Sequence, residues 1–382
     1  MTQTLQAPRI SPTKAPELPH RLRSIPRRTL VEVGGSAVAA VCVVWFSFTV
    51  AGITGPLGFG FCSIAAFFFI YGVLCWLLHG VLAMKDRLAT FAIWTGALVA
   101  LVPLLAVIGY VVYKGLPVVA AHFPSFFVKD FDGYTAKAPV TAVGAGAAIV
   151  GTVEQVGLAT LFTVPLGILT ATYLVNFHNT LSRAASSVVD AMAGSPAIIP
   201  GLVVYLLWVR PQKEAGQTGF AASLALSIMM LPIVTRTAQE VISIVPGSLK
   251  EAALALGSPQ WRSILRVTLP TARVGLVTAV ILGVARVAGE TAPVLFNAGG
   301  NASYNWNPFK GKQDDLPLRV YQMIFQPGVN ATRDAWGVAF VLVLVVIALF
   351  LMARLIGSKS PGSRRRTVPW KKFGSSASGD SA

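Results

Sequence analysis

The chain of 382 residues carries few charged side chains. Only 12% of its residues are Asp, Glu, Lys or Arg, which is about half the share of a typical globular domain, whereas 54% are hydrophobic. The apolar residues fall in runs of roughly twenty, long enough for a helix to cross a bilayer. This scarcity of charge excludes a soluble enzyme and predicts a protein that crosses a membrane.

Residues that form disulfides or hold metals are also scarce. The three cysteines, Cys42, Cys62 and Cys75, lie inside apolar runs and form no CxxC pair. None of the four histidines has a partner at metal-ligand spacing. We interpret the cysteines as small hydrophobic residues and expect no disulfide, no metal site and no cofactor.

A nucleotide-binding loop is missing from the sequence. No Gly-x-x-x-x-Gly-Lys-Ser/Thr occurs, and Gly311-Lys312-Gln313 fails at its last position. The chain therefore lacks the loop that cradles the phosphates of ATP. It also shows no nucleophile–base constellation, so a membrane enzyme is not favoured.

Charge of one sign is in excess. The formal net charge is +16, from 31 Lys and Arg against 15 Asp and Glu. In a soluble chain this excess would suggest nucleic acid as a partner. In a membrane protein it indicates which side of the bilayer each loop occupies, and we predict no nucleic-acid binding.

The apolar runs predict an all-α polytopic membrane protein with about eight transmembrane helices. The fourth run exceeds one span but is short for two, so we expect one long, tilted helix that is kinked at Pro165. An even number of spans places both termini on one side. The expected spans are Val31–Ile53, Leu57–Leu78, Phe91–Tyr113, Val140–Tyr173, Ala185–Trp208, Phe220–Val234, Val274–Ala298 and Trp336–Ile356.

Two basic tails predict the orientation. The Pro-rich segment 1–30 and the segment 357–382 each contain six Lys or Arg residues. The positive-inside rule places both tails in the cytoplasm, where they can contact anionic membrane lipid. The first apolar run is too long for a cleaved signal peptide, so we expect an uncleaved first helix.

The loop 236–273 is expected to lie on the cytoplasmic side. Ser248 and Glu251 have the spacing of a capping box, which predicts a short helix that Gly257 ends. A second amphipathic helix is expected after Pro259, and Pro270 would close the unit. The alternative interpretation is an ordinary connecting loop.

The same loop resembles the EAA signature of the permease subunits of ABC importers. In that family the loop couples the permease to a cytoplasmic ATPase, so the resemblance implies separate ATPase subunits and no enzymatic activity in this chain. The matching positions, which are the candidate coupling residues, are Glu251, Ala252, Ala253, Gly257, Val267, Leu269 and Pro270.

Two charged residues fall inside the run Val274–Ala298. Each of Arg286 and Glu290 costs about 2.5–3.5 kcal/mol at a helix centre, and their i,i+4 spacing places them within reach of each other. They are either an ion pair that allows insertion or part of a substrate pathway, and we favour the pathway. An arginine suits an oxyanion because its planar fork forms bidentate hydrogen bonds.

A third cation, Arg236, follows the run Phe220–Val234 closely. It is a candidate for the exit end of the pathway. The alternative is a side chain that snorkels to the membrane interface together with Glu240.

The stretch Gly289-Glu-Thr-Ala-Pro293 resembles a motif of the PstA family, permease subunits of bacterial phosphate importers. The Gly/Pro-rich stretch Gly194–Gly201 is similar to a helix start in the same permeases. The resemblance covers 91–356 and implies a six-helix type I ABC importer core that is preceded by two extra helices within 31–80. It also implies inorganic phosphate as substrate, a PstC-like permease partner, two PstB-like ATPase subunits, a PstS-like phosphate-binding protein and a bacterial cell membrane.

Three other functions remain possible at this point. An importer of another oxyanion, such as molybdate or sulfate, would share the coupling loop but not the Arg286/Glu290 motif. A self-contained channel or secondary transporter would leave the coupling loop unexplained. A membrane enzyme would need a catalytic constellation, and we find none.

Overall fold

The computed structural model describes residues 27–132, 134 and 144–358. Nearly all of the predicted tail 1–30 and of the tail 357–382 lies outside these residues, as do the first four residues of the predicted span Val140–Tyr173. The described part is helical and contains no strand, with a single bridge between Gly299 and Gln313. The predicted all-α class is confirmed. The chain divides into two units, Met1–Ala106 and Val107–Ala382.

The first unit consists of α1 (Arg27–Ala51) and most of α2 (Pro56–Ala121). At 1.5 Å per residue the 66 residues of α2 measure about 99 Å, which is more than three times the thickness of the hydrocarbon core. The helix is interrupted at Gly80, whose φ of 81° and ψ of 173° are not helical. The predicted spans Leu57–Leu78 and Phe91–Tyr113 lie on either side of this glycine.

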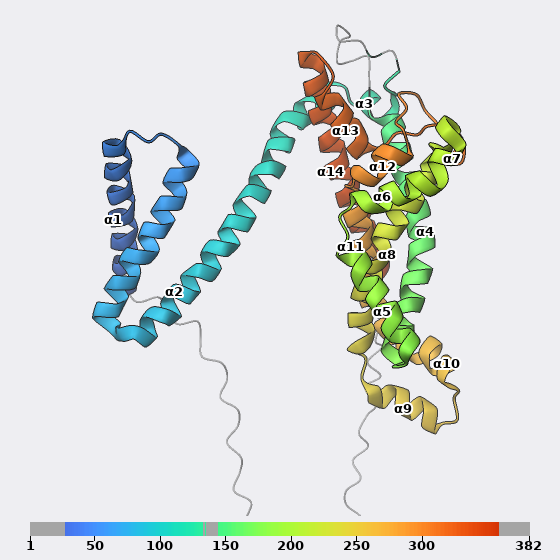
Figure 1. Ribbon diagram of the computed structural model, residues 1–382, viewed down its shortest axis with the longest axis horizontal. Helices are drawn as coiled ribbons and strands as arrows, with labels where there is room; N and C mark the ends of the chain where they lie inside the picture. The colour runs from blue at the N-terminus through green and yellow to red at the C-terminus, as the bar shows by residue number, and fades with distance from the viewer. Residues whose placement is uncertain (1–26, 133, 135–143, 359–382) are drawn as a thin grey trace, which may run out of the picture. The chain divides into compact units, whose positions relative to one another are not determined.

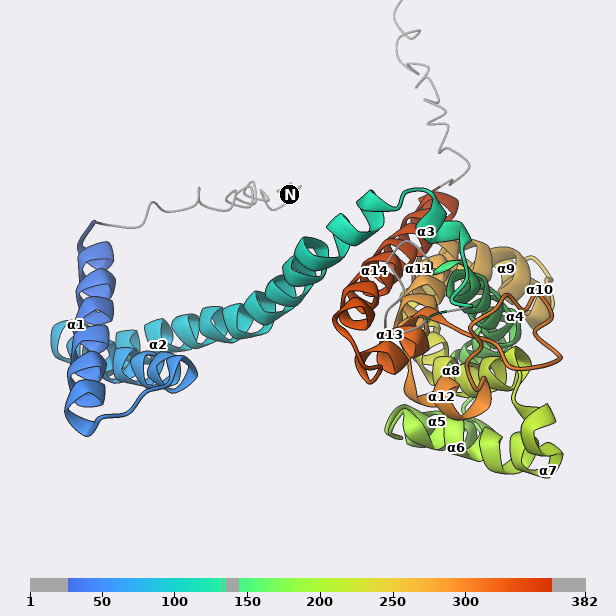
Figure 2. The same ribbon diagram turned by 90° about the horizontal axis from the view of Figure 1, so that it is seen from above.

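The second unit is a bundle in which α8 is central. Helix α8 packs most extensively against α4 and α11, and α14 packs against α11 and α13 (Figures 1 and 2). Its elements are α3 (Ser125–Val128), α4 (Gly146–Asn176), α5 (Thr180–Ala193), α6 (Ile198–Val204), the π-helix η2 (Tyr205–Val209), α7 (Arg210–Gln212), the 3₁₀-helix η3 (Lys213–Gly216), α8 (Gly219–Ser243), α9 (Gly247–Ala255), α10 (Gln260–Ser263), the π-helix η4 (Ile264–Thr268), α11 (Leu269–Val287), α12 (Ala292–Asn297), α13 (Leu316–Ile324) and α14 (Val329–Ser358).

The number of membrane crossings agrees with the sequence. Six helices in the described residues are long and apolar enough to cross a membrane, and a bent pair adds a seventh. Helix α2 is long enough for two crossings, so the described residues offer up to eight candidate crossings when the bent pair is counted as one. The long fourth span is one helix, α4, which continues through Pro165 as expected.

Two predicted spans have a different shape in the structure. The span Ala185–Trp208 is not straight, because α5 and the segment 198–216 are bent by 107° at a break that contains Pro196. Figure 2 shows α5, α6 and α7 following one another along one edge of the bundle. The span Val274–Ala298 is shifted: its helix starts at Gln260 and ends at Val287, and α12 is a separate short helix.

Candidate functional site

Arg286 and Glu290 lie at the point where a membrane helix breaks. Arg286 is in the last turn of α11. Glu290 lies beyond the end of this helix, in a turn in which the Glu290 amide donates to the Val287 carbonyl (3.1 Å). Arg286 Nε and Glu290 Oε1 are 3.5 Å apart, so the two side chains meet as the spacing predicts. The Arg286 side chain is 61% exposed and that of Glu290 17%, so the guanidinium is largely open to a further partner.

The expectation of one continuous helix through both residues is wrong. The helix stops because Gly289 supplies no side chain to pack, and Pro293 lacks the amide that a continuing helix would need. A break inside a membrane protein leaves backbone groups that must bond elsewhere, and such breaks are found where they line a cavity or are covered by protein. The pair therefore occupies an irregular segment and not a regular helix face.

The break packs directly against the second Gly/Pro-rich stretch of the sequence. A Cβ atom on Gly201 of α6 would lie 2.7 Å from Pro293 Cα, so the two backbones touch only because residue 201 is a glycine. Asn297, which is fully buried, donates from Nδ2 to the carbonyls of Gly201 (2.9 Å) and Pro293 (2.7 Å). Asn297 carries no recognisable signal in the sequence, because its partner in α6 is distant in the chain.

Arg236 lies inside α8, which continues to Ser243. Its guanidinium forms an ion pair with Asp190 of α5 and donates to the carbonyl (3.1 Å) and Oγ (2.8 Å) of Ser186. It also donates to Gln239 Oε1 (2.6 Å) on its own helix. In the part of the chain that the structure describes, these bonds tie α5 to α8, and none reaches Arg286 or Glu290.

The predicted coupling residues of α9 are on the surface. No residue of α9 is buried, and Glu251 and Ala252 are exposed. Gly257 follows with a φ of 78°, and a Cβ atom there would meet no atom within 4 Å. Apolar side chains are exposed beside it: Leu249, Leu254 and Leu256. A small, partly apolar projection of this kind suits contact with another protein.

Two details of this loop differ from the prediction. Helix α9 begins at Gly247 after Pro246, and no side chain caps it, so the expected capping box of Ser248 and Glu251 is wrong. The second helix is not a separate surface helix, because α10, η4 and α11 run on as one span from Gln260 to Val287.

The remaining three coupling positions lie in that span. Val267 is in the π-helical turn, and Leu269 and Pro270 start α11. Pro270 does not end the unit, because a proline is compatible with the first turn of a helix.

A buried polar network lies at the other end of the bundle from α9. Gln313 donates to Glu154 Oε2 (2.5 Å) of α4, and the backbone amide of Gln313 donates to the Ala298 carbonyl (3.1 Å). Arg319 Nε is 2.6 Å from Asp314 Oδ2, with both side chains buried. Burial raises the pKa of Asp314 to about 6, although the nearby Arg319 opposes the shift.

The next carboxylate, Asp315, caps α13. Its Oδ1 accepts from the Leu318 amide (2.7 Å), and burial raises its pKa well above the ordinary value. An Asp directly before Leu-Pro is a helix-start signal, so Asp315 was recognisable. The Asp314–Arg319 pair was not, since it depends on burial.

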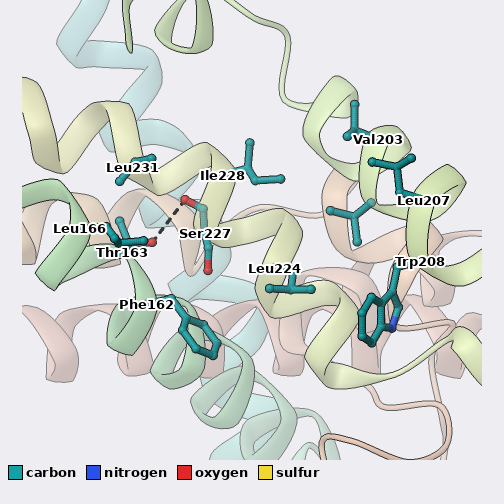
Figure 3. Close-up of a pocket in the computed structure, with 11 residues that line it drawn as sticks. Phe162, Thr163, Leu166, Val203, Leu207, Trp208, Leu224, Ser227, Ile228 and Leu231 are labelled. Carbon is teal, nitrogen blue, oxygen red and sulfur yellow. Dashed lines mark hydrogen bonds between the residues drawn. The ribbon is translucent and has the colours of Figure 1, made fainter. Parts of the chain in front are cut away.

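A cavity of about 440 Å³ in the second unit is unsuited to an oxyanion (Figure 3). It lies between α4, α6 with η2, and α8, and its lining is almost wholly apolar. Its two hydroxyls are already bonded, from Thr163 to the Ser227 carbonyl (3.2 Å) and from Ser227 to the Ser223 carbonyl (2.7 Å). Neither Arg286 nor Glu290 lines it. Across the described residues no group of three His, Cys, Asp or Glu side chains could hold a metal ion.

Known proteins with similar sequences share the permease architecture. Residues 163–359 match the family described as binding-protein-dependent transport system inner membrane component. The "phosphate transport system permease protein PstA 1" of Mycobacterium tuberculosis is 36% identical over 287 residues, which are 75% of this chain and 91% of the relative. The "phosphate transport system permease protein PstA" of Mycobacterium leprae is 36% identical over 70% of this chain and 87% of the relative.

A solved structure shows the same fold. A bacterial ABC transporter involved in the import of the acidic polysaccharide alginate has a chain that is 17% identical, with a TM-score of 0.50. The match covers 72% of this chain and 97% of that one, and it confirms the expected permease fold. The chain therefore belongs to the inner membrane component family of binding-protein-dependent transport systems and, within it, to the PstA permeases.

Proposed function

We propose that this chain is the transmembrane permease subunit of an ATP-driven importer of inorganic phosphate. The observation that carries the proposal is the open guanidinium of Arg286, held beside Glu290 at a helix break in the bundle. The relatives named for phosphate transport supply the substrate. Transport would proceed by alternating access around this site.

The chemistry of the pair suits a transported anion. Arg286 presents a planar fork of N–H donors that can bond two phosphate oxygens at once. Glu290 repels a bare anion, so it holds Arg286 between transport events or favours a partly protonated phosphate. A contact of 3.5 Å with a side chain that is 61% exposed is weak, so a phosphate can displace the carboxylate at little cost.

The partners follow from what the chain does not contain. We propose that α9 with Gly257 docks into a PstB-like ATPase, two copies of which serve this chain and a PstC-like permease partner. We place both termini and α9 in the cytoplasm, so that the loop 299–315 faces a PstS-like phosphate-binding protein outside the cell.

The protein would then be a multi-pass component of a bacterial cell membrane. Arg236, which ties α5 to α8, would act on the pathway only through the position of these helices.

Phosphate uptake by cells tests the substrate site. Arg286→Gln keeps a similar length and removes the charge, so we expect uptake to fall by at least about tenfold, with normal assembly of the complex. Arg210→Gln, at an exposed arginine of α7, is the matched control and should leave uptake unchanged. Normal uptake in assembled Arg286→Gln complexes would sink the role of Arg286. Preferential uptake of sulfate or molybdate by the native chain would replace the proposed substrate.

A second experiment tests the coupling element. Gly257→Val places a β-branched side chain at a φ of 78°, which strains the turn, and adds bulk to the docking projection. We expect the ATPase subunits to be lost on purification and uptake to fall. Gly247→Ala in the same element adds a Cβ at ordinary contact distance, 4.0 Å from Glu251 Oε1, and should change neither. An intact, active Gly257→Val complex would refute the docking claim.

A further inference from the structure

Asn297 joins three helices around the break that carries Arg286 and Glu290. Its side chain bonds α12 to α6 through the carbonyls of Pro293 and Gly201. Its backbone carbonyl accepts from the amide of Thr218, the residue that caps α8 (2.9 Å). The side chain is fully buried, so these bonds form where water does not compete.

The segment between α11 and α12 is short, and of its four residues only Ala288 is buried. Residues 288–291 separate the two helices, and a Cβ atom on Gly289 would meet nothing within 4 Å. The direction of Glu290 is therefore set by the ends of the segment: α11 on one side and α12 on the other. Helix α12 has only six residues, and its close contact with α6 is the Gly201–Pro293 approach that Asn297 bridges.

We infer that Asn297 is a positioning residue for the Arg286–Glu290 pair. By fixing α12 to α6, it fixes where Glu290 stands relative to Arg286 and so how open the guanidinium is to an anion. The part of this inference that concerns phosphate rests on the proposed function, whereas the positional part does not.

The connection that Asn297 makes between α12 and α6, called the joint below, depends on the hydrogen bonds that its side chain donates and not on any that it accepts. Both bonds of the Asn297 side chain come from Nδ2, and its Oδ1 has no hydrogen-bond partner among the described residues. Asn297→Asp has the same shape but no N–H group, so it turns a carboxylate toward two carbonyl oxygens. Asn179 is the opposite case, because its Oδ1 accepts from the Ser182 amide (2.9 Å) and the Tyr173 hydroxyl (3.0 Å). Asn179→Asp keeps that acceptor and is the matched control.

Two readouts on the assembled complex test the inference. The first is the KM for phosphate uptake. The second is the rate at which a water-soluble maleimide modifies Gly289→Cys, in a full-length chain whose native Cys42, Cys62 and Cys75 are replaced by alanine. Gly289 is exposed and has open space around it, so its labelling rate reports on the break.

We expect Asn297→Asp to raise KM and to change the labelling rate, each by roughly tenfold, which corresponds to the loss of a buried hydrogen bond. Asn297→Ala removes the same donors without adding charge and should act in the same direction. Asn179→Asp should leave both readouts within about twofold of the native values.

Several results would overturn the inference. A native labelling rate in assembled Asn297→Asp complexes would show that the joint does not hold the break. A reduced amount of complex with native KM and native labelling would make Asn297 a folding residue only, as would failure of both Asn297 variants to assemble. If the native chain takes up no phosphate, the proposed function fails, and the labelling comparison still decides whether Asn297 holds the break.

Discussion

The two units of the chain differ in how much of themselves they bury. In the second unit four clusters of buried hydrophobic side chains connect α4, α8, α11, α12 and α14. In the described part of the first unit few side chains other than glycine are buried, namely Ser36, Ala40, Val44, Tyr71 and Cys75. Apolar composition alone does not separate these cases, because both units are rich in hydrophobic residues. What differs is whether the apolar side chains pack against other residues of the same chain or lie exposed on its surface.

Polar side chains follow the same division. The first unit pairs Glu32 of α1 with Arg87 of α2 at 2.9 Å, and both side chains keep part of their surface exposed. The second unit encloses the Asp314–Arg319 pair and holds Arg286, Glu290 and Asn297. The ion pair of the first unit therefore stays in partial contact with its surroundings, whereas that of the second unit is enclosed by its own chain. This contrast makes the second unit the natural place for a transport site.

The largest expected effect comes from removing one member of each ion pair. Arg319→Leu leaves the buried Asp314 without its cation and should destabilise the protein by about 3–5 kcal/mol. Arg87→Leu leaves Glu32 able to reach water and should cost about 1 kcal/mol or less. Thermal unfolding of the purified variants measures both losses. Equal losses would remove the distinction between the two units.

An intermediate effect is expected from pH. The pKa of Asp314 is raised by burial from 3.8 to about 6, so the folded protein keeps this proton at a pH where the unfolded chain has released it. The stability contributed by this residue therefore falls as pH rises from about 4 to about 6, by about 3 kcal/mol, and is constant above that range. Asparagine does not titrate, so the unfolding free energy of Asp314→Asn should not show this fall. The difference between the native chain and the variant, measured as a function of pH, should therefore change by about 3 kcal/mol between about pH 4 and about pH 6. Parallel profiles would contradict the raised pKa.

The smallest effect separates glycines of the two units. A Cβ atom on Gly151 of α4 would overlap the carbonyl oxygen of Asp314, so Gly151→Ala should destabilise the protein by about 1–3 kcal/mol. A Cβ atom on Gly96 of α2 meets nothing within 4 Å, so Gly96→Ala should be neutral or stabilising by up to about 1 kcal/mol. The unfolding midpoints of the two variants, each compared with that of the native chain, measure these changes in stability. A loss at Gly96 as large as that at Gly151 would show that the first unit packs tightly.

The sequence predicts those features that depend on composition over about twenty residues. Apart from Ala185–Trp208 and Val274–Ala298, the predicted spans lie in helices of the described residues, and the continuous helix through Pro165 and the contact between Arg286 and Glu290 are also present. Each of them follows from local spacing or from the length of an apolar run, and no distant contact is needed.

Features that depend on distant contacts were missed. Two examples are the side chains of Asn297 and Arg319. Asn297 donates to the carbonyl of Gly201, which is distant in the chain, and Arg319 pairs with Asp314, whose burial the sequence does not indicate.

The bend between α5 and α6 and the end of α11 at Val287 are a different case. Each lies at a local Gly/Pro signal, Pro196 in the first and Gly289 with Pro293 in the second, inside a run that its length alone marks as one span. The capping box at Ser248 failed for a local reason, since the helix begins at Gly247 after Pro246, two residues earlier than a Ser248 cap requires.

The bend between α5 and α6 has a consequence for the biogenesis of the protein. Helix α5 has 14 residues and is about 21 Å long, too short to cross a hydrocarbon core of about 30 Å, and the chain turns by 107° after it. The insertion machinery therefore does not receive a straight span here. The close contact of Gly201 is with Pro293, which is synthesised only after α8 and α11. The contact that fixes the bent pair against α12 can therefore form only late in synthesis, so errors in membrane insertion should concentrate at this segment.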